Sequence, residues 1–240
     1  MDGVLADIWS SWGFVHAYFG LNNDHSLKEY MDGKIDDREF MRRDIKMWKA
    51  NGIKNAAQLE PAYAKIPIMN GARECIAELK KRGIVTAMVS AGLDGLARRI
   101  QKETGLDIIC SDGIETDENG NFTGEGIYSV ALRDKGATVK EVRKSLGIKK
   151  PETASIGNSC FDISMFNESG FAVAFNPNDE CVKRCADKVV EKKDLREILR
   201  LISTNEAAIA AASNYRRTIF LLKPLIPARF LWRLNSGTEK

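Results

Sequence analysis

Residues 153–162 read TASIGNSCFD, a run of strand length that passes directly into a polar loop. Asn158 and Asp162 stand four positions apart in that loop, ahead of a short helical pattern at 163–166. Amide and carboxylate oxygens are ligands that the hard cation Mg²⁺ accepts, so the loop is a candidate metal site. The same residues also fit an N-cap cluster for the following helix, with Asp162 as the cap. The loop alone leaves both interpretations open.

Strands and helices alternate on both sides of this loop. Such alternation indicates a parallel sheet with helices on both faces, so we expect an α/β protein with a Rossmann-like sheet. The expected strands lie at 84–90, 107–110, 153–156 and 171–175, the expected helices at 72–81, 93–103, 137–146, 163–166 and 194–202, and a hairpin turn at 118–121.

Residues 7–64 carry a different pattern. Apolar side chains recur there at intervals of three to four residues, which is typical of helices, and no convincing strand is present. We therefore expect a helical insertion at 10–65, placed within a core domain made of residues 1–9 and 66–202.

Polar side chains stand near the carboxyl ends of strands, where open α/β sheets bind their ligands. Ser90 closes the expected strand at 84–90, and the small residues Ala91 and Gly92 leave room for a phosphate beside backbone N–H groups. Lys135 begins a helix, where the helix dipole does not favour a cation. A serine at a strand end and a solvated lysine are also ordinary in this fold, so each residue alone fits a structural role.

The chain opens with Met1-Asp2-Gly3-Val4-Leu5. A phosphatase that forms an aspartyl-phosphate uses the pattern Asp-x-Asp-Gly-[Thr/Val], in which the first Asp is the nucleophile and the second protonates the leaving oxygen. Two residues along an extended chain return to the same side, so both carboxylates face one site. Asp2 fits the second Asp of this pattern, although Asp-Gly is also a common turn signal.

Taken in order, Asp2, Ser90, Lys135 and the loop from Asn158 to Asp162 resemble the four motifs of the haloacid dehalogenase-like (HAD) phosphatases. The chain looks most like the phosphoserine-phosphatase branch of that superfamily, over roughly residues 1–202. The segments that carry the resemblance are 89–92, 120–126, 135–137, 155–166 and 193–199.

The resemblance implies a Mg²⁺-dependent phosphomonoester hydrolase that acts on a small phosphorylated metabolite through an aspartyl-phosphate. Asp2 would be the general acid/base, and its backbone carbonyl would be a metal ligand. Asn158 and Asp162 would hold the Mg²⁺ with it. Asn158 stands where the family has Asp, so we expect weaker Mg²⁺ binding through the loss of one negative charge.

The same resemblance assigns the phosphate-binding residues. Ser90, with Ala91 and Gly92, would bind the transferring phosphoryl group, and Lys135 would hold nucleophile and phosphate together. The insertion at 10–65 would be a cap that closes over the site and selects the substrate.

Two further features depart from the branch. The position of the nucleophile falls before Met1, and we expect that the sequence starts at an internal methionine and that the nucleophile lies upstream. Trp9 stands where the branch carries a Glu for the substrate amine, so phosphoserine is not assured as substrate, while Arg42 or Arg43 could meet a substrate carboxylate. The rival hypothesis is a catalytically inactive relative that binds a phosphorylated ligand or a protein partner.

The composition of the chain limits its remaining function classes and its location. The 240 residues are 44% hydrophobic and 29% charged, and the net charge of +3 is too small to suggest nucleic-acid binding. Neither a signal peptide nor an apolar run of the roughly 20 residues that a membrane span needs is visible. The five cysteines are scattered without zinc-type spacing, so we expect reduced, buried thiols in a cytoplasmic protein.

Residues 203–240 combine apolar and basic side chains and fall outside the resemblance. Three interpretations stay open for this tail. It could pack on its own core or on a second copy in a homodimer, lie on a membrane surface, or be disordered.

Overall fold

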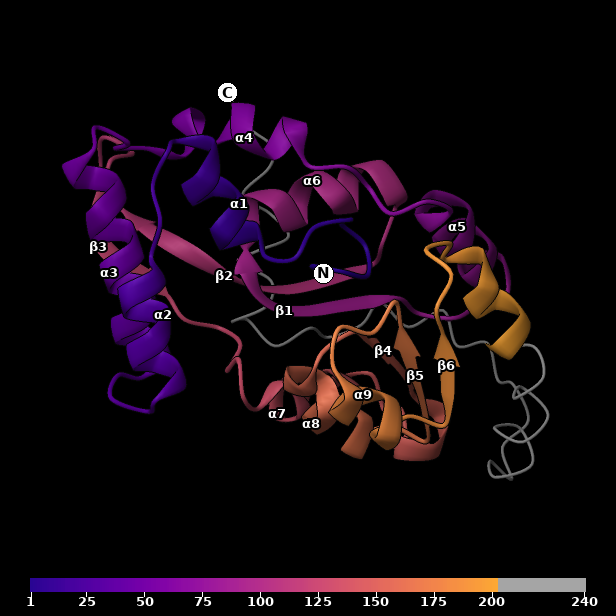
Figure 1. The fold of residues 1–240 in the computed structure, drawn as a ribbon. Helices are drawn as coiled ribbons and strands as arrows, with labels where there is room; N and C mark the ends of the chain where they lie inside the picture. The colour runs from indigo at the N-terminus through magenta and orange to yellow at the C-terminus, as the bar shows by residue number, and fades with distance from the viewer. Residues whose placement is uncertain (203–240) are drawn as a thin grey trace.

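The computed structural model describes residues 1–202, so the tail at 203–240, with its proposed homodimer or membrane contact, lies outside the described residues. The described part is an α/β fold in which strands alternate with helices (Figure 1). The predicted fold class is confirmed. The labelled helices are α1 Ser11–Tyr18, α2 Asp24–Met31, α3 Asp37–Ala50, α4 Glu60–Lys65, α5 Ala72–Lys81, α6 Asp94–Thr104, α7 Lys135–Ser145, α8 Ile163–Asn167 and α9 Glu180–Cys185, and residues 196–202 are also helical.

The strands are β1 Ala87–Leu93, β2 Ile108–Thr116, β3 Phe122–Ile127, β4 Ala154–Gly157, β5 Phe171–Phe175 and β6 Lys188–Val190. They form two three-stranded sheets, ordered β1-β2-β3 and β4-β5-β6. Strands β1 and β2 are parallel, as are β4, β5 and β6. Strands β2 and β3 are antiparallel and are joined by the predicted turn, where Gly120 takes the positive φ of 77°.

Several predicted bounds need correction. The strand expected at 84–90 begins at Ala87 and continues through Leu93, so Ser90 lies inside β1 and not at its end. The N–H of Ile84 bonds to the end of α5, and Thr86 donates to the carboxylate of Asp107, so pairing with β2 starts only at Ala87. Helix α9 and strand β6 were not predicted.

The helices between residues 10 and 65 share one hydrophobic cluster with the sheets. Ile45 and Trp48 of α3 are fully buried in the same cluster as Leu96 of α6 and Phe175 of β5. At about 1.5–3 kcal/mol for each large side chain removed from water, this cluster is a major source of stability.

A buried polar chain joins α1 to α3. Trp48 Nε1 donates to His16 Nδ1 over 2.8 Å, and His16 Nε2 lies 3.2 Å from Asp44 Oδ2. The ring of Trp48 also stacks on Trp12, with centroids 5.1 Å apart. These contacts fix α1, and therefore the loop before it, against α3.

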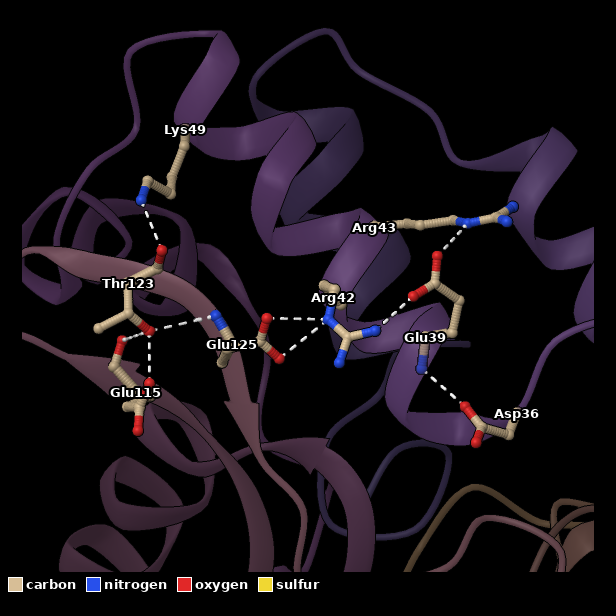
Figure 2. A network of polar contacts seen from close by, with 8 residues as sticks. All are labelled: Asp36, Glu39, Arg42, Arg43, Lys49, Glu115, Thr123 and Glu125. Carbon is tan, nitrogen blue, oxygen red and sulfur yellow. Dashed lines mark hydrogen bonds and ion pairs between the residues drawn. The ribbon is translucent and has the colours of Figure 1, made fainter.

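Helix α3 lies along strand β3, and an ion pair and a hydrogen bond join the two (Figure 2). Arg42 Nε donates to both carboxylate oxygens of Glu125 over 2.8 and 2.9 Å, and Arg42 Nη1 donates to Glu39 over 2.6 Å. Lys49 Nζ donates to the carbonyl of Thr123 over 2.8 Å. The hairpin β2–β3 is thus tied to α3 by charged side chains.

The expected state of the cysteines is wrong for three of them. Cys160 and Cys181 form a disulfide with their Cα atoms 5.7 Å apart, and Cys185 is an exposed thiol. Cys75 and Cys110 are buried free thiols as predicted. Cys160 and Cys181 are 21 residues apart in the sequence, so their spacing did not indicate that they pair. Of the helices in the described range, none has the length and apolar character to cross a membrane.

Candidate functional site

Asp2 is half-buried in the candidate site. Its Oδ2 accepts hydrogen bonds from the backbone N–H of Ser11, over 2.8 Å, and from the Ser11 hydroxyl, over 2.9 Å. Its Oδ1 is buried and has no hydrogen-bond partner among the described residues. Burial raises the pKa of Asp2, against the opposing effect of the Met1 amino group and the two Ser11 hydrogen bonds. The carboxyl therefore favours the protonated form more than an exposed Asp does.

Ser11 connects Asp2 to strand β1 and was missed by the sequence analysis. The side chain is fully buried, and its hydroxyl accepts from the Leu93 N–H over 3.3 Å while donating to Asp2. Ser10 caps α1 by accepting from the Gly13 N–H over 3.2 Å. A pair of serines at a helix start is a signal for a cap, and the second serine was the residue aimed at Asp2.

Lys135 and Asp162 form a buried ion pair next to Asp2. Lys135 Nζ lies 2.7 Å from Asp162 Oδ1, and both side chains are largely withdrawn from water. Burial alone would raise the pKa of Asp162, but the Lys135 ammonium and the Asn158 N–H hold it below its usual value. These two motifs therefore lie side by side in space.

The loop after β4 surrounds Asp162 with donors. Asp162 Oδ2 accepts from the N–H groups of Asn158, over 2.9 Å, and of Ser159, over 3.1 Å. A Cβ at Gly157 would lie 2.4 Å from the Cβ of Asp162, so the loop closes this tightly only with glycine. The alternative that the sequence left open, an N-cap by Asp162, is not fulfilled, because Asp162 precedes α8 but its side chain accepts no hydrogen bond from that helix.

Asn158 reaches across to the start of the chain. A Cβ at Gly3 would lie 2.1 Å from Asn158 Nδ2, so the Asn158 side chain packs directly on the Gly3 backbone. The predicted metal residues Asp2 and Asn158 are therefore neighbours in space.

Ser90, Ala91 and Gly92 lie against the same group. Ser90 is buried, and its hydroxyl accepts from the Gly92 N–H over 3.1 Å. The carbonyl of Ala91 accepts from Trp12 Nε1 over 3.1 Å, which docks α1 on β1. A Cβ at Gly92 would lie 2.7 Å from the Ser11 hydroxyl, so only glycine lets β1 approach this closely.

The donor set fits a hard cation such as Mg²⁺. Asp2, Asn158 and Asp162 offer oxygen atoms within one cluster, in which Asn158 and Asp162 are buried and Asp2 is half-buried, and oxygen is the ligand that Mg²⁺ prefers. Asp2 Oδ1 is an unpartnered buried acceptor among the described residues. An ionised carboxylate has about four acceptor positions, so Asp162 keeps capacity beyond Lys135 and the two loop N–H groups.

The structure does not bring Arg42 to this group. Its guanidinium is taken by Glu39 and Glu125, and Arg43 pairs with Glu39 and Glu29. Within residues 1–202, no described contact joins Arg42 to Asp2, so its substrate role stays a prediction. Trp9 is 73% exposed and borders a hollow of about 220 Å³ lined by Ile8, Trp9, Ser10, Gly13 and Phe14.

Replacing Ser11 tests the link between Asp2 and β1. We expect Ser11→Ala to lower the free energy of unfolding by about 1–3 kcal/mol, because a buried hydroxyl with two partners is lost. We also expect the pKa of Asp2 in the folded protein to rise further. The free energy of unfolding of the variant should therefore fall more steeply as the pH rises through that pKa. Urea unfolding at pH 4 to 8 measures both effects. Ser10→Ala removes only the helix cap, so its loss of stability should not vary with pH in this way.

Gly136 sets the position of Lys135. A Cβ at 136 would lie 2.3 Å from the backbone carbonyl oxygen of Ser164, which cannot rotate away. We expect Gly136→Ala to cost about 1–3 kcal/mol of stability, measured by urea unfolding. Gly13→Ala is the matched control, because a Cβ there meets Ser10 at an ordinary 3.6 Å and should be neutral or stabilising. Equal stability of both variants would contradict the close packing of α7 on α8.

Comparison with known proteins agrees with this geometry. The family model for haloacid dehalogenase-like hydrolases matches residues 11–167. The phosphoserine phosphatase of Methanocaldococcus jannaschii is 34% identical over 177 residues, which cover 73% of this chain and 81% of that protein. That of Wolinella succinogenes is 31% identical over 201 residues, covering 83% of this chain and 93% of that protein.

A solved structure points the same way. A substrate-bound phosphoserine phosphatase complex is similar with a TM-score of 0.71 and 30% identity, covering 84% of this chain and 94% of that chain. Both the matched segment and the cluster of Asp2, Lys135 and Asp162 agree with the resemblance found in the sequence. The chain therefore belongs to the haloacid dehalogenase-like hydrolase family and is phosphoserine-phosphatase-like within it.

Proposed function

We propose that this protein is a Mg²⁺-dependent phosphatase that hydrolyses a small phosphorylated metabolite through an aspartyl-phosphate. The observation that carries the proposal is Asp2, a buried carboxyl with a raised pKa and a free Oδ1, beside the Lys135–Asp162 pair. A group that must give up a proton to a leaving oxygen needs a pKa near the working pH, and burial moves Asp2 in that direction.

The residues divide the work of phosphoryl transfer. Asp2 protonates the leaving oxygen and later accepts a proton from the attacking water. The Ser90 hydroxyl and the backbone N–H groups near it hold the phosphoryl oxygens, and the Lys135 ammonium neutralises their charge. When bound by the Asp2 carbonyl, Asn158 and Asp162, Mg²⁺ supplies further positive charge to the transferring group.

The route also calls for a nucleophilic carboxylate two positions before Asp2, which the 240 residues do not include. The helices between 10 and 65 would act as the cap that excludes water, over a core made of 1–9 and 66–202. Relatives named phosphoserine phosphatases support a small phosphorylated substrate, but Trp9 offers no carboxylate for an amine. A cytoplasmic location stays a prediction.

The decisive experiment compares two chains. One has the 240 residues, and the other adds the residues encoded in frame upstream of Met1. Both are assayed on p-nitrophenyl phosphate with Mg²⁺ and with EDTA. We expect turnover by the longer chain that requires Mg²⁺. A stop codon directly upstream, or a folded longer chain with an added Asp and no metal-dependent turnover, would favour the rival role of a non-catalytic phosphate-binding relative.

Restoring a carboxylate at position 158 should strengthen metal binding. We expect Asn158→Asp to raise Mg²⁺ affinity by about tenfold, because one more negative charge faces the cation. Calorimetric titration of Mg²⁺ into the variant and the parent chain gives the two dissociation constants. Asn158→Ala is the control, because it removes the oxygen ligand and should weaken binding. Equal affinity of all three chains would place the metal away from Asn158.

A further inference from the structure

The Cys160–Cys181 disulfide lies inside the candidate metal loop. Cys160 stands between Asn158 and Asp162, at the start of the short 3₁₀ turn η3 Cys160–Asp162. Cys181 is the second residue of α9, which follows β5. The bond therefore joins the loop after β4 to the segment after β5, at the edge where the candidate site lies.

Two hydrogen bonds run beside the disulfide. The Cys160 N–H donates to Asp179 Oδ2 over 3.1 Å, and the Asn178 N–H donates to the carbonyl of Asn158 over 2.8 Å. The loop that carries Asn158 and Asp162 is thus held from outside by three contacts with residues 178–181. The disulfide is the covalent one of these three.

The disulfide is accessible from solvent. Cys160 is exposed and Cys181 is half-buried, whereas the free thiols of Cys75 and Cys110 are buried. Exposed disulfides are the ones that small thiols and dithiols reduce readily, while buried structural ones resist them. The Cys160–Cys181 disulfide is thus both open to reduction and attached to the loop that carries the candidate metal ligands.

We infer that Cys160 and Cys181 form a reversible redox site that controls the order of the loop at 157–162. In the disulfide form, the loop is held in the conformation in which Asp162 receives the Asn158 and Ser159 N–H groups. In the dithiol form, only the two hydrogen bonds to Asn178 and Asp179 remain of these three contacts, and the loop opens more often. The proposal of a redox site depends on the described contacts alone. Only the effect of loop opening on metal binding rests on the proposed function.

The chemistry is thiol–disulfide exchange with a low-molecular-weight disulfide, RS–SR, as oxidant. The Cys160 thiolate attacks one sulfur of RS–SR, which forms a mixed disulfide and releases RS⁻. The Cys181 thiolate then attacks Cys160 Sγ, closes the protein disulfide and releases the second RS⁻. The two cysteines lose two electrons and two protons, and RS–SR becomes two RSH. A dithiol reductant reverses both steps.

Thiol counting tests the pair directly. The full chain is equilibrated in oxidised or reduced glutathione buffer, quenched in acid, unfolded, alkylated and analysed by mass spectrometry. We expect three alkylated cysteines after oxidation and five after reduction, with a Cys160–Cys181 cross-linked peptide only in the oxidised sample. Five alkylated cysteines in both samples would overturn the proposal.

Hydrogen exchange tests the effect on the loop without any assay of activity. We expect the amides of 158–162 to exchange about tenfold faster in the reduced protein, because local opening becomes easier. Cys160→Ser and Cys181→Ser should exchange at the reduced rate in either buffer. Cys185→Ser, an exposed cysteine outside the pair, should keep the redox response. Identical exchange of the oxidised and reduced protein would overturn the control of the loop.

A bound metal is the main competing outcome. The sulfur atoms of Cys160 and Cys181 and a carboxylate oxygen of Asp179 all lie within 4.8 Å of one another, and thiolates bind Zn²⁺. Elemental analysis of the protein after incubation with Zn²⁺ and gel filtration distinguishes the two. Stoichiometric zinc that is lost in Cys160→Ser and retained in the presence of oxidised glutathione would overturn the redox site. If thiol counting and hydrogen exchange show the redox response but Mg²⁺ binds the oxidised and the reduced protein with equal affinity, only the proposed effect on metal binding is wrong, and the redox site itself stands.

Discussion

Lys135→Met is expected to lower the free energy of unfolding by about 3–5 kcal/mol, because it leaves the Asp162 carboxylate as an unpaired buried charge. Methionine matches the unbranched apolar stem of lysine and lacks only its terminal ammonium, so packing around the stem is preserved. Asp162 would retain the Asn158 and Ser159 N–H groups on Oδ2 but would lose the ammonium 2.7 Å from Oδ1. Urea unfolding at pH 7 measures the loss.

A double variant separates the lost charge from other effects. Lys135→Met with Asp162→Asn removes both charges, and we expect it to recover much of the stability that the single variant loses. If the single variant matches the parent chain within about 0.5 kcal/mol, the pair is not an interaction of two desolvated charges. The double-mutant cycle gives the coupling energy itself.

The pH dependence of this effect follows from the pKa of Asp162. Burial opposes ionisation, but Lys135 and the loop N–H groups hold the pKa of Asp162 below its ordinary value. The pair therefore stabilises the fold above the unfolded pKa of about 3.9, and the contribution is lost as pH falls through the folded pKa. The difference between parent and variant should be largest at neutral pH and should narrow below about pH 4.

Those parts of the fold with strong local signals were predictable. Helix α5 has its predicted bounds at Ala72 and Lys81, because its apolar face is periodic and Gly83 can take the positive φ that ends the helix. Strand β5 has its predicted bounds at Phe171 and Phe175, because every residue of its apolar run is buried. In both segments the local pattern and the tertiary burial favour the same structure.

Elements without such signals were missed or misplaced. Strand β6 has three residues, two of them exposed, and it exists only because it pairs with β5. The start of β1 depends on Asp107, a side chain 21 residues from Thr86, which binds the segment before the strand. Periodicity within a short window contains neither interaction.

The residues of the candidate site also fall into those that the sequence could predict and those that it could not. Asp2, Ser90, Lys135, Asn158 and Asp162 could be named from motif order, and the structure brings them into one cluster. Ser11 and the Cys160–Cys181 pair could not be named, because their partners are set by how α1 and α9 dock. Arg42 was proposed from its position in the resemblance to the branch, and its carboxylate partners lie on α3 and β3.

Asp2→Asn should abolish most of the turnover without unfolding the protein. In the chain extended upstream of Met1, we expect kcat on p-nitrophenyl phosphate to fall by about 10²–10⁴, the usual contribution of a positioned general acid. Asparagine keeps the shape of the side chain and can still accept from Ser11 through its oxygen, but it has no proton to give to the leaving oxygen. Steady-state kinetics on purified protein measure the change in kcat and KM.

The stability of the same variant tells a catalytic loss from a structural one. Burial raises the pKa of Asp2 above its unfolded value, so Asp2 favours the fold below the unfolded pKa and this contribution is lost as pH rises through the folded pKa. The asparagine side chain carries no charge, so Asp2→Asn should be at least as stable as the parent at neutral pH, with unfolding that depends less on pH. A substrate with a better leaving group, such as 2,4-dinitrophenyl phosphate, needs less protonation and should recover part of the rate. Equal losses on both substrates would assign Asp2 to positioning, because only a general acid is sensitive to the leaving group.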